Sequence, residues 1–204
     1  PVAGHMSLPS AEGIELGLDT FGDVTVAGDG SPKHPAQVIR DVVDQGVLAD
    51  SVGVSVFGIG EHHRPDFAVS SPDVVLAAIA ARTSRIRLNT AVTVLSSDYP
   101  IRVYERFATL DALSSGRAEI TVGRGSFIES FALFGHSLDD YEVLFEEKLD
   151  LLVRALDEEP IEWTGSTRLP LTGQQAFPPT ESGRLPVWVG VGGSPESVIR
   201  AARH

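Results

Sequence analysis

The sequence of 204 residues has no cysteine, no long apolar run and few basic residues. The absence of cysteine excludes disulfides, thiolate catalysis and cysteine-ligated zinc, and it fits a cytoplasmic protein. No apolar run approaches the roughly 20 residues that span a bilayer, so we expect no membrane partner. Acidic residues outnumber basic ones by 28 to 16, and the formal net charge of −12 argues against a nucleic-acid partner.

Apolar, β-branched segments alternate with segments of helical periodicity along the chain. Strands are predicted at residues 14–18, 52–59, 86–95, 118–122 and 186–191, and helices after them at 38–47, 72–81, 99–115, 141–156 and 195–204. Ser71 and Ser194 each precede a proline, the residue preferred at the first helical position, and are predicted to cap their helices. The segment 158–185, rich in proline and glycine, is predicted to be irregular.

This order of elements indicates an α/β protein with a parallel sheet and helices outside it. An open doubly wound sheet and a (β/α)8 barrel both fit the local pattern. A barrel typically needs about 250 residues, so this chain has room for only about the first five β-α units. The barrel interpretation treats residues 1–6 as an expression scar. It makes residues 7–204 the N-terminal part of a single barrel domain whose C-terminal units are missing.

Such a piece would leave two sheet edges unpaired. We therefore expect the remainder of the protein, or a partner, to complete it.

Ligands of both architectures sit at the carboxyl ends of the strands, and polar residues follow several predicted strands. Glu61, His62 and His63 follow the second strand and could supply a general base, a pH switch or metal ligands. Successive strand side chains point to opposite faces, so only one histidine is expected to face a given site. A metal site would need further ligands at other strand ends, where only Asp19 qualifies.

Two further strand ends carry features suited to an anion. Arg124 lies between two glycines after the fourth strand, and its planar guanidinium suits a phosphate. Gly193 and Ser194 precede the last helix, where backbone N–H groups form an anion site. A surface arginine in a turn and an ordinary helix cap are the alternative interpretations of these features.

Taken in order, these segments make the sequence resemble the luciferase-like flavin monooxygenase family. The resemblance lies in residues 60–63, 90–95, 99–102, 110–117, 123–125, 131–135, 185–189 and 192–194. It implies a TIM-type (β/α)8 barrel that binds reduced FMN at the mouth. Gly123 stands where luciferases carry a cysteine, so the resemblance does not imply light emission.

The resemblance also implies roles for individual residues. His62 matches the active-site histidine, which Glu61 and His63 would support. The bond between Ala91 and Val92 matches a non-proline cis peptide beneath the flavin ring. The remaining residues expected to bind the cofactor are Phe21, Arg124, Gly193, Ser194 and Ser197, of which all but Phe21 would hold the phosphate.

The leading hypothesis is an FMN-dependent oxidoreductase, a monooxygenase that uses O2 on a small organic substrate. A flavin reductase as supplier of reduced FMN and a homodimeric state complete this expectation. A deazaflavin-dependent dehydrogenase of the same family, a metal-dependent barrel hydrolase and a flavin-binding protein without turnover are the alternatives. The substrate pocket is expected in the loops 23–35, 126–139 and 158–185. Phe127, Phe131 and Phe134 either line that pocket or pack on the barrel rim.

Overall fold

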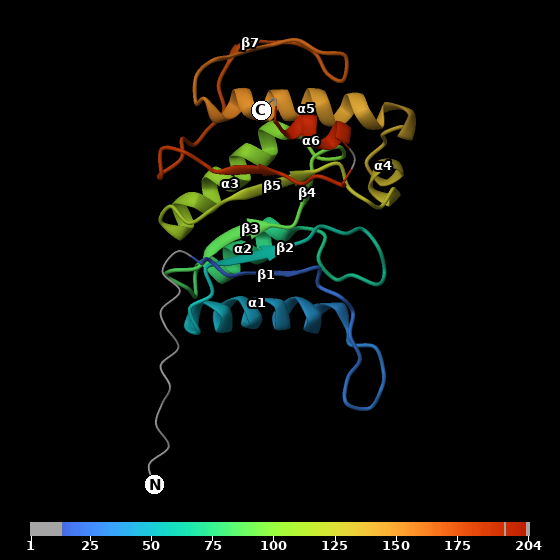
Figure 1. The fold of residues 1–204 in the computed structure, drawn as a ribbon, viewed down its shortest axis with the longest axis vertical. Helices are drawn as coiled ribbons and strands as arrows, with labels where there is room; N and C mark the ends of the chain where they lie inside the picture. Colours follow the sequence, from blue (N-terminus) through green and yellow to red (C-terminus); the bar gives the residue numbers. More distant parts are fainter. Residues whose placement is uncertain (1–13, 194, 203–204) are drawn as a thin grey trace.

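The computed structural model describes residues 14–193 and 195–202 and shows parallel strands with helices on their outer side (Figure 1). One sheet has the order β1-β2-β3 and a second has the order β4-β5-β8. The strands are β1 Gly17–Thr20, β2 Val56–Ile59, β3 Arg87–Thr90, β4 Thr93–Val94, β5 Ile120–Gly123 and β8 Val187–Val189.

The two sheets form one row of strands. Leu88 of β3 makes a parallel bridge with Ala118, just before β5. Its N–H donates to the carbonyl of Arg117 and its carbonyl accepts from Glu119, both over 2.9 Å. Since only two residues separate β3 from β4, the two strands form one continuous segment of the row. The five predicted strands are therefore confirmed, side by side in chain order.

The row does not close in the part of the chain that the structure describes. β1 pairs only with β2, and β8 pairs only with β5. The expected α/β class with parallel strands and outer helices is confirmed, whereas closure into a barrel is not seen. The first strand also lies later than predicted, because its pairing with β2 runs from Gly17 opposite Val56 to Thr20 opposite Ile59.

Four helices, α1, α2, α3 and α5, pack next to one another in chain order along the outside of the row. In Figure 1, α1 lies against the β1-β2-β3 side, and α3 and α5 lie against the side of β5 and β8. Each of α1, α2, α3 and α6 begins with a proline, as its lack of a free N–H favours. The helices are α1 Pro35–Ser51, α2 Pro72–Ala80, α3 Pro100–Ser114, α5 Tyr141–Leu156 and α6 Pro195–Ala201.

Helix caps and loops differ in part from the prediction. Ser71 occupies the N-cap position of α2, but its side chain makes no capping hydrogen bond. The segment 158–185 contains an antiparallel hairpin of β6 Ile161–Trp163 and β7 Leu171–Gln174, so it is not wholly irregular. The predicted loop 126–139 contains α4 Glu129–Leu133, and the 3-10 helix η1 Leu138–Asp140 overlaps its end.

The hydrophobic core lies between the helices and the outer face of the row. Its fully buried side chains include Leu76, Ile79, Leu88, Phe107, Ile120 and Leu152. The two edge strands are less covered: Leu18 of β1 is 51% exposed and Trp188 of β8 is 58% exposed. None of the helices in the described ranges is long and apolar enough to cross a membrane.

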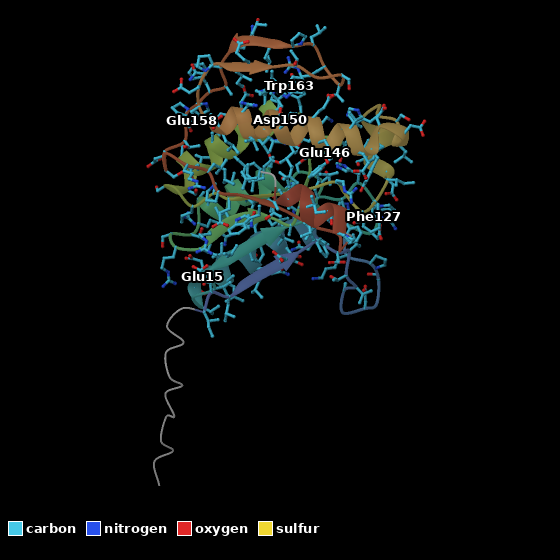
Figure 2. The ribbon with its side chains drawn as sticks, turned by 45° about the horizontal axis from the view of Figure 1, so that its top comes forward. Glu15, Phe127, Glu146, Asp150, Glu158 and Trp163 are labelled. Carbon is cyan, nitrogen blue, oxygen red and sulfur yellow. The ribbon has the colours of Figure 1, made fainter. Side chains whose placement is uncertain are left out.

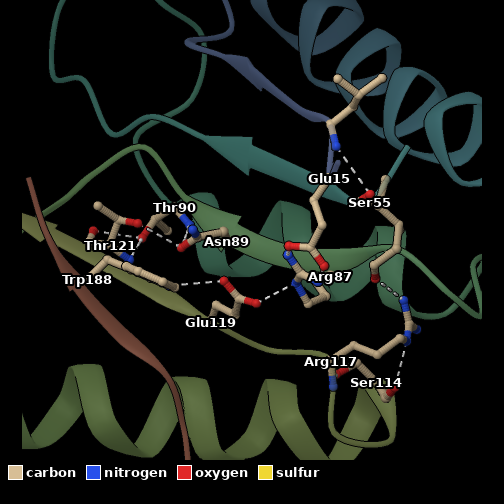
Figure 3. A network of polar contacts seen from close by, with 12 residues as sticks. Glu15, Ser55, Arg87, Asn89, Thr90, Ser114, Arg117, Glu119, Thr121 and Trp188 are labelled. Carbon is tan, nitrogen blue, oxygen red and sulfur yellow. Dashed lines mark hydrogen bonds and ion pairs between the residues drawn. The ribbon is translucent and has the colours of Figure 1, made fainter. Parts of the chain in front are cut away.

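A polar network runs across the row from the segment before β1, at one edge, to β8, at the other edge (Figure 3). Arg87 of β3 donates to both carboxylate oxygens of Glu15, over 2.8 and 2.7 Å. The same guanidinium pairs with Glu119 at 2.6 Å. The other oxygen of Glu119 accepts a hydrogen bond from the Trp188 indole at 3.1 Å. These contacts link β3 and β8 to the residues just before β1 and β5, away from the carboxyl ends of the strands.

Candidate active site

The carboxyl ends of β2, β4 and β5 lie beside a cavity of about 400 Å³. All strands of the row are parallel, so these ends share the edge at which α/β proteins bind ligands. The cavity is lined by Phe21, Glu61, His62, His63, Phe67, Ala91, Val92, Val94, Gly125, Ser126, Phe127, Glu129 and Ser130. Six of the predicted site residues therefore lie together here: Phe21, Glu61, His62, His63, Ala91 and Val92.

Glu61 joins two of the strand ends. Its Oε1 lies 2.9 Å from Nε2 of His63, and its Oε2 accepts the N–H of Val94 at 2.9 Å. The residue is 9% exposed, so these contacts occupy a buried carboxylate. Glu61 therefore ties the end of β2 to β4 and orients His63, the neighbour of His62.

Both histidines line the same cavity, so the expectation that only one would do so is wrong. That expectation assumed strand geometry, in which neighbouring side chains alternate between faces. β2 ends at Ile59, however, and residues 60–63 are not in a strand. His63 also lines a second cavity, of about 410 Å³, together with Glu61, Arg106 and Phe134.

Aromatic side chains surround His62. Its ring stacks on Phe67 with the centroids 4.1 Å apart and the planes 25° apart. Phe21 and Phe127 each approach it edge-on, with centroid distances of 5.2 Å. Figure 2 shows Phe127 at this edge of the molecule. The imidazole is thus held between rings, which fixes its orientation without a charged partner.

The protonation of His62 follows from this environment. Burial lowers the pKa of His62 from its ordinary value of 6.5, and the more distant carboxylates of Asp23, Glu61 and Asp66 oppose the shift. Its Nε2 is buried and has no hydrogen-bond partner in the described part of the chain. Buried polar atoms are normally paired. A neutral imidazole with a free nitrogen is suited to exchange a proton or hydrogen bond with a bound molecule.

The floor of the cavity is formed where β3 passes into β4. The Ala91–Val92 peptide bond is cis, which confirms the prediction for this link. Gly123 of β5 packs so closely that a Cβ there would lie 2.6 Å from Cγ2 of Val92. A Cβ on Gly60 would likewise lie 2.4 Å from Cδ1 of Phe21. Glycine at these two positions allows the walls of the cavity to approach each other.

Arg124 does not line this cavity, although Gly125 beside it does. Its guanidinium forms an ion pair with Glu142 of α5 and lies over the ring of Tyr141, 5.1 Å from the centroid. The Tyr141 hydroxyl donates to the Gly125 carbonyl at 3.0 Å. The predicted phosphate ligand is therefore held at the rim by α5.

The second predicted phosphate element is described only in part. Gly193 is exposed and has φ of +86°, with open space where a Cβ would be. Ser197 is buried, at 4% exposure, within α6. Neither lines the cavity. The predicted role and cap of Ser194 fall on a residue outside the described ranges.

Two residues at the cavity, Arg64 and Phe67, were not predicted from the sequence. Arg64 donates to Glu129 at 2.8 Å, and its guanidinium lies 4.6 Å from the ring centroid of Phe127. It thereby holds the loop with Phe127 against His62. Arg64 directly follows the Glu-His-His run, which is the only signal that pointed to it. Phe67 sits in an ordinary loop sequence, and nothing in the pattern marks it.

The three loop phenylalanines have different environments. Phe127 lines the cavity, Phe131 is buried with its ring stacked on Tyr141, and Phe134 contacts His63 edge-on at 5.1 Å. The two expectations for this cluster therefore each hold for part of it. Within residues 14–193 and 195–202, no three His, Asp or Glu side chains are arranged to hold a metal ion.

The chain is similar to known proteins in sequence and in fold. The N-acetyl-S-alkylcysteine monooxygenase of Bacillus subtilis is 31% identical over 89% of this chain. The monooxygenase RslO1 of Streptomyces bottropensis has a similar structure, with a TM-score of 0.80, 27% identity and coverage of 93% of this chain and 57% of that one. The chain spans about half of the length of the first curated relatives it matches, 52% for the Bacillus enzyme.

Two more distant structures share the fold but differ in cofactor. The oxygenating constituent of 3,6-diketocamphane monooxygenase from Pseudomonas putida was solved with FMN; it has a TM-score of 0.72 and 20% identity over 86% of this chain and 50% of that one. The coenzyme F420 dependent tetrahydromethanopterin reductase of Methanopyrus kandleri has a TM-score of 0.67 and 20% identity over 94% of this chain and 54% of that one. The family model for luciferase-like monooxygenases matches residues 20–204, and the chain belongs to that family.

Proposed function

We propose that the protein is an FMN-dependent monooxygenase in which the cavity at the strand ends receives the flavin ring. The observation that carries this proposal is the buried Nε2 of His62, which has no hydrogen-bond partner among the described residues and lies in a cavity walled by aromatic residues. Bound reduced FMN would supply the electrons with which O2 is activated. The family's named monooxygenases support the reaction class.

The residues present fit a planar, largely apolar group with polar edges. Phe21, Phe67 and Phe127 offer ring faces and edges, and the small apolar side chains of Ala91 and Val92 line the same cavity. The glycine at 123 keeps a side chain from pushing Val92 into this space. Such sites are typically concave, mostly apolar and supplied with few polar groups.

We assign the proton chemistry to His62. Its lowered pKa keeps the imidazole neutral at neutral pH, so Nε2 can accept a proton from substrate or cofactor and return it later. The surrounding rings exclude water from that nitrogen. Glu61 and His63 act on the wall of the site, since Glu61 fixes both His63 and the Val94 backbone.

We assign the cofactor phosphate to Arg124, with Gly193, Ser194 and Ser197 as the second half of the clamp. Arg124 already lies at the rim, and its guanidinium can donate hydrogen bonds to a phosphate in place of the Glu142 carboxylate. That carboxylate is 59% exposed, so releasing it to water costs little. A homodimer, a flavin reductase partner and a small organic substrate remain predictions of the proposal.

The first test is a fluorescence titration of the purified protein with FMN and with a deazaflavin. We expect saturable FMN binding that Phe127→Leu weakens by about two- to ten-fold, the equivalent of the roughly 0.5–1.5 kcal/mol that an aromatic contact contributes. Phe177→Leu is the matched control, because Phe177 is 62% exposed and does not line the cavity.

The outcomes separate the hypotheses. Binding of the deazaflavin with no binding of oxidised or reduced FMN would replace the monooxygenase with a hydride-transferring dehydrogenase. Equal effects of the Phe127 and Phe177 substitutions would remove the cavity from the proposal. Binding of neither cofactor would overturn flavin chemistry altogether.

A further inference from the structure

A separate, smaller pocket lies beside α5. It is enclosed by α5, the loop between β4 and α3, His136 from the loop before η1, and the β6–β7 hairpin. Figure 2 shows Trp163 of this hairpin near Asp150 of α5, and the indole donates to that carboxylate at 2.9 Å. The pocket has a volume of about 130 Å³ and shares no lining residue with the cavity at His62.

A buried ammonium group lines this pocket. Lys148 is 7% exposed, and its Nζ donates to the carbonyl of Ser96 at 2.6 Å and lies 3.3 Å from Nε2 of His136. An ammonium has three donors, so one remains available. Among the described residues Lys148 forms no ion pair. A buried charge that is matched only by neutral groups is uncommon, because burial without a counter-charge is costly.

A guanidinium lines the same pocket and also has no carboxylate partner within residues 14–193 and 195–202. Arg168, in the hairpin, donates from Nη1 to the Tyr99 hydroxyl at 2.6 Å and from Nε to the Leu169 carbonyl at 2.8 Å. Its contacts in the described part of the chain are likewise to neutral oxygens and to the Tyr99 ring. Two cationic groups therefore line one small pocket without an internal anion bound to either.

The two carboxylates that line the pocket are already occupied. Glu147 accepts hydrogen bonds from the backbone N–H and hydroxyl groups of Ser166 and Thr167, which hold the pKa of Glu147 at about 2. Asp98 forms an ion pair with Arg106 and accepts the N–H of Tyr99 at 2.7 Å. Both carboxylates are thus bonded to other donors, and among the described residues neither forms an ion pair with Lys148 or Arg168.

We propose that this pocket binds a small oxyanion, a carboxylate or a phosphate group, between Lys148 and Arg168. The volume suits an anion of a few heavy atoms and is too small for the whole of a flavin cofactor. His136 would complete the polar wall beside Lys148. The site is additional to the proposed flavin site and does not depend on it.

The titration of Lys148 gives the proposal a pH dependence. Burial lowers the pKa of Lys148 to about 8, and the charge of Asp98 opposes the shift. The groups that face Lys148 are His136, Asp98, Glu147 and Arg168. Acetate is ionised throughout this range and binds the protonated form, so its affinity is highest below pH 8 and falls by about tenfold between pH 7 and pH 9. By the same linkage, the bound anion raises the pKa of Lys148.

The test is calorimetric titration of the purified protein with acetate and, separately, with inorganic phosphate. Arg168→Gln is expected to weaken binding at least tenfold, since it removes one of the two cations. Lys148→Gln should abolish binding, provided that its circular dichroism shows a folded protein. Arg154→Gln is the matched control, because Arg154 is on α5 like Lys148, is 55% exposed and does not line the pocket.

Phosphate would also compete for the proposed clamp at Arg124, so its titration is repeated in an Arg124→Gln background. A preference for acetate identifies a planar carboxylate as the ligand class, and a preference for phosphate identifies a tetrahedral one. The proposal is overturned if neither anion binds saturably. It is equally overturned if Arg168→Gln and Arg154→Gln behave alike, or if affinity does not fall above pH 8.

Discussion

The two sides of the strand mouth differ in how far they are organised without a ligand. On the side of β2 and β4, His62 is fixed between rings and Glu61 is bonded to both His63 and Val94. On the rim toward β8, Gly193 is exposed and Arg124 pairs with the carboxylate of Glu142. The first side is built by packing, whereas the second depends on charges that an anion can rearrange.

The difference indicates a division of tasks. Packed rings keep the imidazole of His62 in one orientation, so no ordering cost remains when a ligand binds. A rim arginine in an exposed ion pair is bound weakly enough to change partner. We therefore expect substitutions of His62 and Glu61 to affect turnover or folding, and substitutions of Arg124 and Glu142 to affect cofactor affinity alone.

The largest effect is expected at His62. His62→Gln removes the group that accepts and returns a proton while keeping a polar side chain of similar size. The rate of reduced-FMN-dependent turnover should fall by about 100- to 10,000-fold, with FMN affinity changed little. Steady-state kinetics with a cofactor titration checks this. A loss of FMN affinity without a loss of turnover would show that His62 binds the cofactor and does not transfer a proton.

The pH profile sharpens the same point. Because burial lowers the pKa of His62 below 6.5, the acid limb of kcat/KM should lie below pH 6.5. The folded protein disfavours the protonated ring, so this residue's contribution to stability decreases as the pH falls below 6.5. A limb above that value in the wild-type enzyme would contradict the assigned environment. Loss of the limb in His62→Gln identifies the titrating group.

A smaller effect, on stability, is expected at Glu61. Glu61→Ala leaves the buried N–H of Val94 without its acceptor and frees His63. The free energy of unfolding should fall by about 1–3 kcal/mol, the penalty for an unsatisfied buried group. Urea denaturation measures it, and Glu105→Ala, which removes an exposed ion pair on α3, is the control. Equal changes in both variants would show that Glu61 does not join the strands energetically.

The smallest effect is expected at Glu142. Glu142→Gln removes the negative charge that occupies Arg124 and should tighten FMN binding by less than about 1 kcal/mol, because exposed ion pairs contribute little. Turnover at saturating FMN should not change. Weaker binding in this variant would mean that Glu142 positions Arg124 for the phosphate rather than competing with it.

The sequence predicted the elements better than the contacts between them. β-branched runs and helical spacing placed the β-α units, and the prolines marked helix starts at Pro35, Pro72, Pro100 and Pro195. The β6–β7 hairpin was missed because its strands are short and lie in a segment rich in proline and glycine.

The site was predictable to the extent that it depends on chain order. The resemblance located Glu61, His62, His63 and the cis bond at Ala91–Val92. Pairing of Arg124 with Glu142 depends on where α5 lies over the rim, and a local pattern does not contain that information. A local pattern also does not predict that the Phe67 ring stacks on His62. Nor does it predict that, among the described residues, Lys148 and Arg168 line one pocket without an ion pair to a carboxylate.

A comparison of FMN with riboflavin tests whether the mouth holds FMN with its phosphate at Arg124. Riboflavin lacks the phosphate, so Arg124→Gln should weaken FMN binding by about 1.5–3 kcal/mol, the contribution of a charged hydrogen bond, and leave riboflavin binding unchanged. Arg82→Gln, at an exposed ion pair far along the chain, should change neither. Equal losses for both ligands, or no loss for FMN, would contradict the claim.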